Sequence, residues 1–308
     1  MMIRQAAFEG NRKMLKGALH CHTTRSDGDG DPGDVMRMHK ENGYDFIALT
    51  DHRRYNYESF APETGLTVIP GMELDANFPR KGGVHCIHTV SIGPEKEKGN
   101  GFEHDQRFET VSIEKPSDYQ PMLDYLHENG NLTIYCHPEW SNTPISEFKD
   151  LEGNFAMELW NSGCAIENEL DVDNGFIWDQ VNQHGNRLWG VAVDDGHAMN
   201  QHCRGWVMVN AENDVSAILD ALRRGAFYAS TGPEIYDFRI EDDMAYVECS
   251  PCANIIFRTG LRPLRLQRNG DGFITSAVTK VLDYFPFVRA VVTDEKGMKA
   301  WTNPIFLD

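Results

Sequence analysis

Hydrophobic runs of strand length alternate with helical patterns between about residues 15 and 225. The runs predict strands at 15–22, 46–50, 66–74, 84–92, 132–136, 155–160, 188–193 and 205–209. Start and stop signals, such as Asp31-Pro32 before one helix and Asn42-Gly43 after it, predict helices at 31–42, 117–126, 175–184 and 213–223. Repeated alternation of strand and helix predicts a parallel sheet, either open or closed into a barrel.

The helical pattern disappears after about Gly232. Short alternating runs predict strands at 235–240, 244–249, 254–258, 264–268, 288–293 and 300–306, with a tight turn at 294–297. We therefore expect two domains, 1–232 with the alternating pattern and 233–308 as a small β-rich, sandwich-like module.

Polar residues of one chemical kind stand at the ends of six hydrophobic runs. The segments are His20-Cys21-His22, Thr50-Asp51-His52, Gly71-Met72-Glu73, Val84-His85-Cys86-Ile87-His88, Cys136-His137-Pro138 and Asp194-Asp195-Gly196-His197. Barrel enzymes gather their active sites from the carboxyl ends of many strands, whereas an open sheet places its site at one switch point. The pattern favours a closed, TIM-like barrel with one pocket.

Imidazole and carboxylate groups in this arrangement suit several divalent metal ions. Residues two apart on a strand project to the same side, so His20 and His22 can reach one ion, as can Asp195 and His197. Glu73 can bridge two ions because each of its oxygens has lone pairs. Such ligands suit Zn²⁺, Mn²⁺ or Fe²⁺, and the sequence does not choose among them.

Charge and cysteine content narrow the classes of partner. The chain has 308 residues and a formal net charge of −18, which would repel a nucleic-acid backbone. Bound cations would reverse the sign locally, so a small phosphorylated substrate stays compatible with this charge. The first residues show no apolar leader, no run reaches membrane-span length, and seven scattered cysteines suit a reducing compartment. We expect a cytoplasmic protein without a membrane partner.

Taken in order, the strand-end motifs resemble those of the PHP (polymerase and histidinol phosphatase) superfamily over roughly residues 15–232. They are the H-x-H of His20 and His22, the S-D-G of Ser26 to Gly28, the T-D-H of Thr50 to His52, the G-x-E of Gly71 to Glu73, the H-P of His137-Pro138 and the D-x-H of Asp195 to His197. Residues 227–233 and 302–305 resemble the C-terminal β-module of two-domain members of the family.

The resemblance implies a distorted (β/α)7 barrel that holds two or three divalent ions for phosphoester hydrolysis. One ion would bind His20, His22, Glu73 and Asp195. A second would share Glu73 and add His137 and one histidine of the strand at 84–92. A third, if present, would use Asp27, His52 and His197. His85 and His88 lie on opposite faces of a regular strand, and the family context favours His88.

The mechanism we expect is in-line attack by a metal-bridging hydroxide on a phosphomonoester of a small metabolite. Glu73, Asp195 and His197 would serve this chemistry directly. Arg53, which follows a ligand, and Arg204, which opens a strand, are candidates to bind the phosphoryl oxygens.

Three further polar residues are expected to support the site, and other functions stay possible. Asp51 is expected to hold a ligand histidine by its far nitrogen, Asp194 to do the same or to cap a turn, and Asn161 to contact substrate. Three alternatives stay open: a phosphodiesterase or nuclease on the same site, a metal-binding scaffold without turnover, and a metal-dependent hydrolase of C–N or C–O bonds.

Overall fold

The computed structural model describes residues 5–8, 14–169, 173–261, 264, 267–268 and 272–307, which form a mixed α/β fold. Its helices are α1 (Pro32–Glu41), α2 (Gln120–Glu128), α3 (Ile145–Phe148), α4 (Ser162–Glu167), α5 (Gly175–Gln183) and α6 (Val215–Arg224). Short 3-10 helices are η1 (Pro62–Thr64), η2 (Lys96–Lys98), η3 (Pro116–Tyr119) and η4 (Met199–Gln201).

One sheet of six strands carries four of the six polar segments singled out above. Its order is β10 (Trp189–Val193), β9 (Ala156–Asn161), β8 (Leu132–Tyr135), β6 (Gly83–Ile92), β5 (Gly71–Arg80) and β7 (Val111–Ser112). A longer sheet contains β11 (Trp206–Val209), β2 (Leu15–Ala18), β3 (Phe46–Ile47) and β4 (Thr67–Val68) in that order.

The two sheets meet at the strand ends. Isolated parallel bridges join Cys21 to Gly196 and His52 to Glu73. They close a ring that runs from β2 and β3 through β5, β6, β8, β9 and β10 back to β2. The ring is compatible with a TIM-like barrel, and it brings the polar strand ends to one rim.

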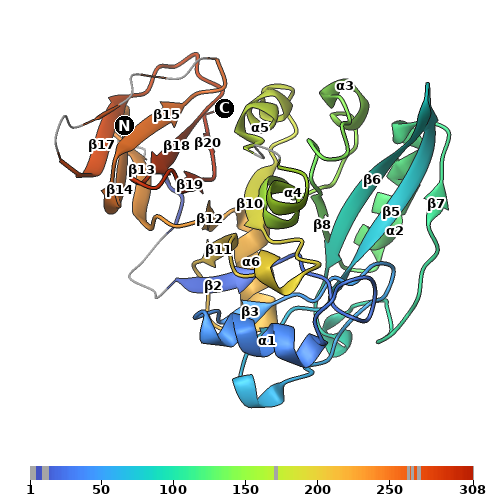
Figure 1. Ribbon diagram of the computed structural model, residues 1–308. Coiled ribbons are helices and arrows are strands. Elements are labelled where there is room, and N and C mark those ends of the chain that lie inside the picture. The colour runs from blue at the N-terminus through green and yellow to red at the C-terminus, as the bar shows by residue number, and fades with distance from the viewer. Residues whose placement is uncertain are drawn as a thin grey trace.

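The predicted parallel sheet is parallel only in part: β9 pairs in parallel with β8 and β10, and β3 with β2 and β4. Strands β5 and β6 form a long antiparallel hairpin with Gly82 at a φ of 98° in its turn, and β6 also pairs antiparallel with β8. Figure 1 shows this hairpin extending past the rim. The expected strand at 66–74 is divided by Pro70, which lacks an N–H donor, into β4 and β5. Hydrophobic runs reveal strands but not their relative direction.

The predicted helices are confirmed with small shifts at their ends. Helix α1 begins after Asp31, whose carboxylate accepts a hydrogen bond from the Gly33 amide, and it ends at Asn42. The segment at 93–115 contains η2 and β7 and buries Phe102.

The ring is filled by apolar side chains that alternate with the outward positions of its strands. Leu19, Ile69, Val90, Ile134 and Val191 are fully buried in one cluster. Each such side chain contributes about 1.5–3 kcal/mol to stability by leaving water. The polar residues at the rim therefore lie next to a closely packed apolar core.

The C-terminal residues form a β-rich region that is consistent with a sandwich. Strands β1 (Gln5–Ala6), β13 (Ile235–Glu241), β14 (Met244–Cys252) and β17 (Ile274–Lys280) make a four-stranded sheet. Its apolar face packs on the second sheet, as Phe238 and Val247 share a buried cluster with Phe257 and Val288. Strand β17 was missed, because only Ala277 of its seven residues is buried and the apolar signal is weak.

The second sheet of this region continues into the ring. It runs through β16 (Gln267–Arg268), β15 (Asn254–Arg258), β18 (Phe287–Thr293) and β19 (Lys299–Thr302), with β20 (Ile305–Phe306) on β18, and β19 pairs with β12 (Phe227–Ser230). The boundary predicted at residue 232 falls between β12 and β13 and stays a prediction. Part of the strand predicted at 264–268 lies outside the described residues.

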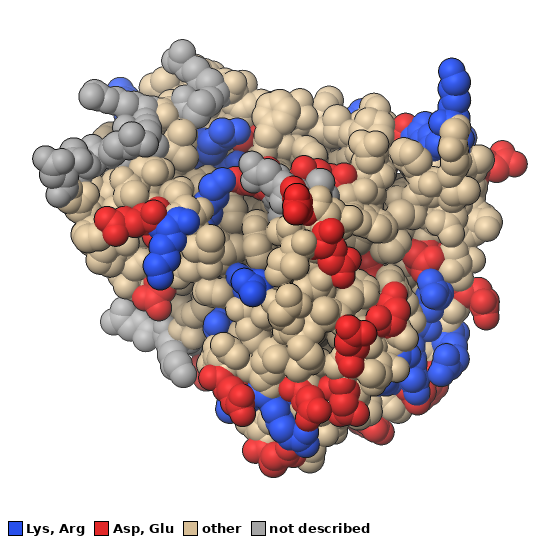
Figure 2. Space-filling model, viewed as in Figure 1, with Lys and Arg blue, Asp and Glu red and all other residues tan. Residues whose placement is uncertain are grey.

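Charged side chains of both signs cover the face shown in Figure 2, with acidic groups gathered over the lower half around α1. This distribution accords with the net charge of −18. Among the described residues, no helix is both long and apolar enough to cross a membrane.

Candidate metal centre

Four of the predicted ligands converge on one buried point. His20 Nε2 lies 3.1 Å from His22 Nε2, 3.2 Å from Asp195 Oδ1 and 3.4 Å from Glu73 Oε2. His22 Nε2 lies 3.0 Å from the same Asp195 oxygen and 3.2 Å from the same Glu73 oxygen. The two histidines follow β2, Glu73 lies in β5 and Asp195 follows β10, so three strand ends build this group.

The far nitrogens of several rings are anchored, and this decides what the near nitrogens can do. His20 Nδ1 lies 2.6 Å from Glu158 Oε1, and His197 Nδ1 lies 2.9 Å from the carbonyl oxygen of Asp195. Because these oxygens can only accept, the proton of each neutral ring is on Nδ1. The Nε2 lone pair of His20 therefore faces carboxylate oxygens that also carry only lone pairs. A cation placed between them would satisfy all of these groups, which is the arrangement expected of a metal site.

Glu73 is placed to bridge two ions. Its Oε1 lies 3.0 Å from His88 Nδ1 and 3.5 Å from His137 Nε2. Its Oε2 faces His20 and His22 and lies 3.0 Å from His52 Nδ1, yet this buried oxygen receives no hydrogen bond. The residues present thus fit the two-ion arrangement that the resemblance implies.

The structure selects between the two histidines of β6. His88 lies against Glu73, while His85 lies beside Phe78 at 5.9 Å between ring centroids, away from the cavity. The alternation of side chains along a strand separates the two, as the spacing predicts.

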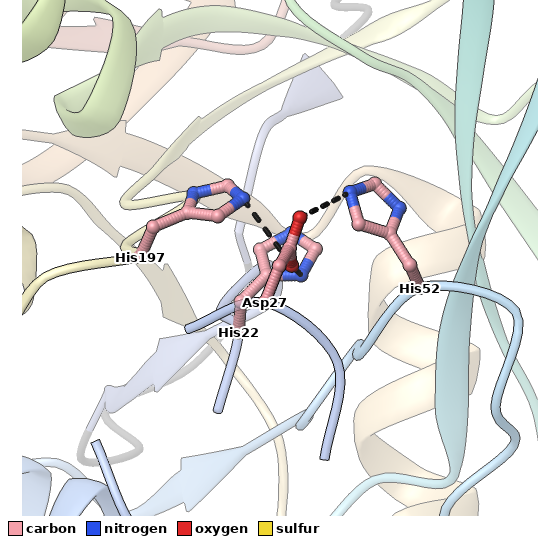
Figure 3. A group of neighbouring side chains, drawn as sticks. All are labelled: His22, Asp27, His52 and His197. Atoms are coloured by element: carbon pink, nitrogen blue, oxygen red, sulfur yellow. Dashed lines mark ion pairs between the residues drawn. The ribbon is translucent and has the colours of Figure 1, made fainter. Parts of the chain in front are cut away.

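A second group surrounds Asp27, as Figure 3 shows. Its carboxylate oxygens lie 3.6 Å from His22 Nδ1, 3.6 Å from His52 Nε2 and 3.6 Å from His197 Nε2. These are the residues expected for a third ion, with His22 in addition. The group is more open than the first, since the Asp27 side chain is 55% exposed.

Electrostatics at the centre favour a cation strongly. Burial opposes ionisation of Glu73, but the neighbouring His20 and His52 hold its pKa well below the usual range. Burial likewise disfavours protonation of His22, but the neighbouring carboxylates of Asp195 and Glu73 raise its pKa to about 9. Without metal, protons compensate the carboxylates. Metal ions must displace these protons, because only neutral imidazole binds a metal.

Two ligand positions have an unusual backbone. His137 has a φ of 23° and Asp195 a φ of 47°, both in the left-handed region that side chains with a Cβ seldom adopt. Such conformations cost of order 1–3 kcal/mol each and persist where the surroundings impose them, often at functional sites. In the S-D-G motif, a Cβ on Gly28 would lie 2.7 Å from the carbonyl carbon of His22. Only glycine allows this turn to approach the ligand strand.

The two groups open into one cavity of about 190 Å³. Its lining consists of Asp27, His52, Glu73, His88, His137, Trp140, Gly163, Cys164, Glu167, Asn168, Asp195 and His197. Among the described residues, this lining includes carboxylates but neither lysine nor arginine. An anionic substrate would therefore depend on metal ions for charge compensation.

The two arginines proposed for the phosphoryl oxygens are turned elsewhere. Arg53 pairs with Asp75, and Arg204 Nε donates a hydrogen bond to the Asn200 carbonyl oxygen. Neither lines the cavity. Sequence adjacency to a ligand misled here, because Arg53 has a φ of 54° and β5 offers it a carboxylate outside the cavity.

Of three other supporting roles, those of Asp51 and Asn161 need correction, and Asp194 takes one of its two expected roles. Asp51 holds no histidine; its carboxylate accepts hydrogen bonds from the Thr23 amide and the Ser26 hydroxyl and so shapes the loop that carries Asp27. Asp194 caps a turn by accepting from backbone amides, including that of Gly205 at 2.9 Å. Asn161 does not face substrate. Its side-chain amide donates to Glu158 and Asp195, and its oxygen caps α4.

Glu158 is the functional residue that sequence reasoning missed. It is fully buried in β9, where one oxygen holds His20 and the other accepts from the backbone N–H of His137 at 2.8 Å. It therefore orients two ligands from behind. The available signal was a single glutamate inside the apolar run Ala156-Met157-Glu158-Leu159-Trp160, where a buried charge needs a partner.

Comparison with known proteins identifies this part of the chain. Residues 18–162 match the model of the PHP domain family. This segment, a little under half of the chain, is similar to the PHP domain. Every ligand candidate except Asp195 and His197 lies inside the matched segment.

Three relatives extend the comparison. A 5'-3' exoribonuclease of Haemophilus influenzae is 33% identical over 82 residues, which span 25% of this chain and 28% of that protein. A two-domain protein from Bacteroides vulgatus, described as containing a predicted PHP-like metal-dependent phosphoesterase, covers 95% of each chain with a TM-score of 0.51 and 16% identity. A protein from Bifidobacterium adolescentis described as a putative metal-dependent phosphoesterase covers 68% of this chain and 96% of its own, with a TM-score of 0.45 and 13% identity. The Bacteroides vulgatus likeness shows a shared fold that includes the C-terminal β-rich region.

Proposed function

We propose that this protein is a metal-dependent phosphoesterase that hydrolyses the phosphomonoester of a small metabolite. The observation that carries the proposal is the buried Oε2 of Glu73, which faces three histidine nitrogens and receives no hydrogen bond. The PHP domain and the phosphoesterase descriptions of structural relatives support the same reaction.

Two or three divalent ions of the Zn²⁺, Mn²⁺ or Fe²⁺ type would be held by His20, His22, Asp27, His52, Glu73, His88, His137, Asp195 and His197. When bound, such ions lower the pKa of water and neutralise charge on phosphoryl oxygens. The protein's own task is to hold these ligands rigidly around the cavity.

The residues around the ligands keep the reacting groups in place. Glu158 and Asn161 fix His20 and Asp195, while Trp140 packs against His137 at 4.9 Å between ring centroids and walls the cavity. A cavity of about 190 Å³ suits a small phosphorylated group, and a phosphoryl dianion would enter it by way of the metal ions.

A nuclease is the second candidate, since the exoribonuclease of Haemophilus influenzae resembles 82 residues of this chain. Its phosphodiester chemistry would use the same ions. Against it stand the net charge of −18 and a cavity lining that, within the described residues, offers neither lysine nor arginine. The indole of Trp140, 42% exposed, is the feature that would suit a nucleobase.

The proposal is tested by activity and metal content on one preparation. Phosphate release from p-nitrophenyl phosphate and a panel of sugar phosphates is compared with cleavage of bis-p-nitrophenyl phosphate and of a 5'-phosphorylated RNA oligonucleotide. We expect turnover of monoesters that chelation abolishes and Mn²⁺ or Zn²⁺ restores. Preferred cleavage of the RNA would favour the nuclease. Bound metal without phosphoester turnover would overturn both candidates.

A further inference from the structure

A second cluster of metal-type side chains lies outside the candidate centre. His39 of α1, Asp194 at the end of β10 and His202 just after η4 are buried together, with relative exposures of 0%, 1% and 5%. One donor atom from each lies within 4.8 Å of the others. The cluster contributes nothing to the lining of the cavity described above.

The hydrogen bonds of His39 leave one nitrogen facing a carboxylate without a proton between them. His39 Nδ1 lies 2.8 Å from the carbonyl oxygen of Val35, which can only accept, so a neutral ring carries its proton there. Its Nε2 then presents a lone pair to Asp194 Oδ2 at 3.7 Å, and it has no hydrogen-bond partner. An anchored far nitrogen with a near nitrogen that faces a carboxylate is also the pattern of His20 in the candidate centre.

The surroundings of His202 are a second, independent indication that this cluster binds a cation. Its ring is 95% buried by the exposure quoted above, and neither Nδ1 nor Nε2 has a hydrogen-bond partner. A buried polar group without a partner costs about 1–3 kcal/mol. Burial, and next the nearby His39, lowers the pKa of His202 to about 4, so the ring is neutral near pH 7. Neutral imidazole is the form that binds metal ions.

We propose that His39, Asp194 and His202 bind a further divalent metal ion of the Zn²⁺ type, separate from the catalytic ions. Two imidazoles and a carboxylate are common Zn²⁺ ligands, and tetrahedral coordination places ligand atoms about 3.3–3.5 Å apart. The 3.7 Å between His39 Nε2 and Asp194 Oδ2 is close to this separation. Asp194 Oδ2 accepts one hydrogen bond, from the Cys203 amide, and keeps a lone pair for the ion.

The position of the cluster indicates a structural role. The His202 ring packs on Gly196, where an added Cβ would lie 2.7 Å from ring atoms. Gly196 stands between Asp195 and His197, two ligands of the candidate centre. An ion on this cluster would tie α1 to the loop that presents them, whichever reaction the centre performs.

The test counts metal ions in variants that separate the two sites. The triple variant H20Q/H52Q/E73Q removes a ligand from each group of the candidate centre and keeps the cluster intact. After dialysis against Zn²⁺ and then metal-free buffer, elemental analysis should find about one equivalent per chain in this variant. Adding His202→Gln should remove it. His184→Gln, at an exposed position that ends α5, is the matched control and should remove none.

Two further measurements keep the proposal falsifiable. In an otherwise unchanged chain, His202→Gln should lower the metal count by one equivalent while circular dichroism shows a folded protein. In the triple variant, chelation should lower the melting temperature and Zn²⁺ should restore it, a readout that needs no change in the cluster. Equal metal counts with and without His202→Gln, or a melting temperature insensitive to chelation, would overturn the proposal.

Discussion

Buried charges gather at two places in this molecule, and the two are built in opposite ways. At the rim of the ring, Glu73 and Asp195 face histidine nitrogens, and neither lysine nor arginine lines the cavity there among the described residues. Between α5 and β18, Asp179 instead receives Arg289 at 2.7 Å and Arg258 at 2.7 Å. The Asp179 carboxylate is compensated by arginine side chains of the protein, whereas Glu73 and Asp195 are placed to receive cations from solution.

The difference teaches how to distinguish a structural ion pair from a metal site. A carboxylate already matched by guanidinium groups holds two parts of a fold together and gains nothing from a metal ion. A carboxylate matched only by anchored histidines is incomplete until a cation binds. The same criterion separates the His39 cluster from an ordinary buried ion pair.

The largest expected effect follows from removing the bridging carboxylate. Glu73→Gln should lower kcat/KM for the best phosphomonoester by more than about 100-fold, the upper range for a group that only supports a ligand. It should also lower the bound metal count. Steady-state kinetics with elemental analysis checks this, and full metal content with normal kcat/KM would contradict the assignment of Glu73.

Removing an arginine from the Asp179 cluster should lower the stability of the protein and leave metal binding unchanged. Arg289→Met leaves part of the buried Asp179 charge uncompensated, and we expect a loss of about 3–5 kcal/mol in the free energy of unfolding. Arg258→Met, which faces the same carboxylate from a side chain 25% exposed, should cost less. Urea denaturation measures both. A loss of metal ions in folded Arg289→Met would contradict the separation of the two clusters.

Glu158 tests whether anchoring the histidines matters. Glu158→Gln keeps the shape but weakens the hold on His20 Nδ1, so the metal affinity should fall by about 10–100-fold. Isothermal titration with Zn²⁺ measures this, with Glu128→Gln at an exposed helix position as the control. An unchanged affinity would mean that the ligand geometry is set by the backbone alone.

The smallest effect on stability is expected from Asp105, a partly exposed carboxylate that pairs with Arg54 and Arg25. Hydrogen bonds from Arg54, offset in part by desolvation, and then from Arg25 lower the pKa of Asp105 to about 2. Since the pKa is depressed in the folded state, the stabilisation is present above the unfolded value of about 3.9 and is lost as pH falls toward 2. The Asp105 carboxylate is 43% exposed, so we expect less than about 1 kcal/mol.

This prediction is checked by comparing Asp105→Asn with the unchanged chain in urea at pH 6 and pH 2.5. The difference in unfolding free energy should shrink at the lower pH. A difference that grows on acidification would reverse the assigned sign.

The amino-acid sequence by itself determined which residues could bind metal and where many of the helices and strands lie. Hydrophobic periodicity depends on near neighbours, so helices such as α1 and α5 and the strand-end motifs at His20, His52 and His137 were readable directly. Strand direction was not readable, because the hairpin of β5 and β6 depends on pairing rather than on local pattern.

Only the tertiary structure decided how these residues meet. It placed His88 rather than His85 against Glu73, turned Arg53 and Arg204 away from the cavity, and brought Glu158 behind His20 from 138 positions along the chain. It also joined His39 to His202, which no motif connects. The physical reason is the same in each case: hydrogen bonds and ion pairs depend on distances between segments remote in sequence, and local patterns carry no record of those distances.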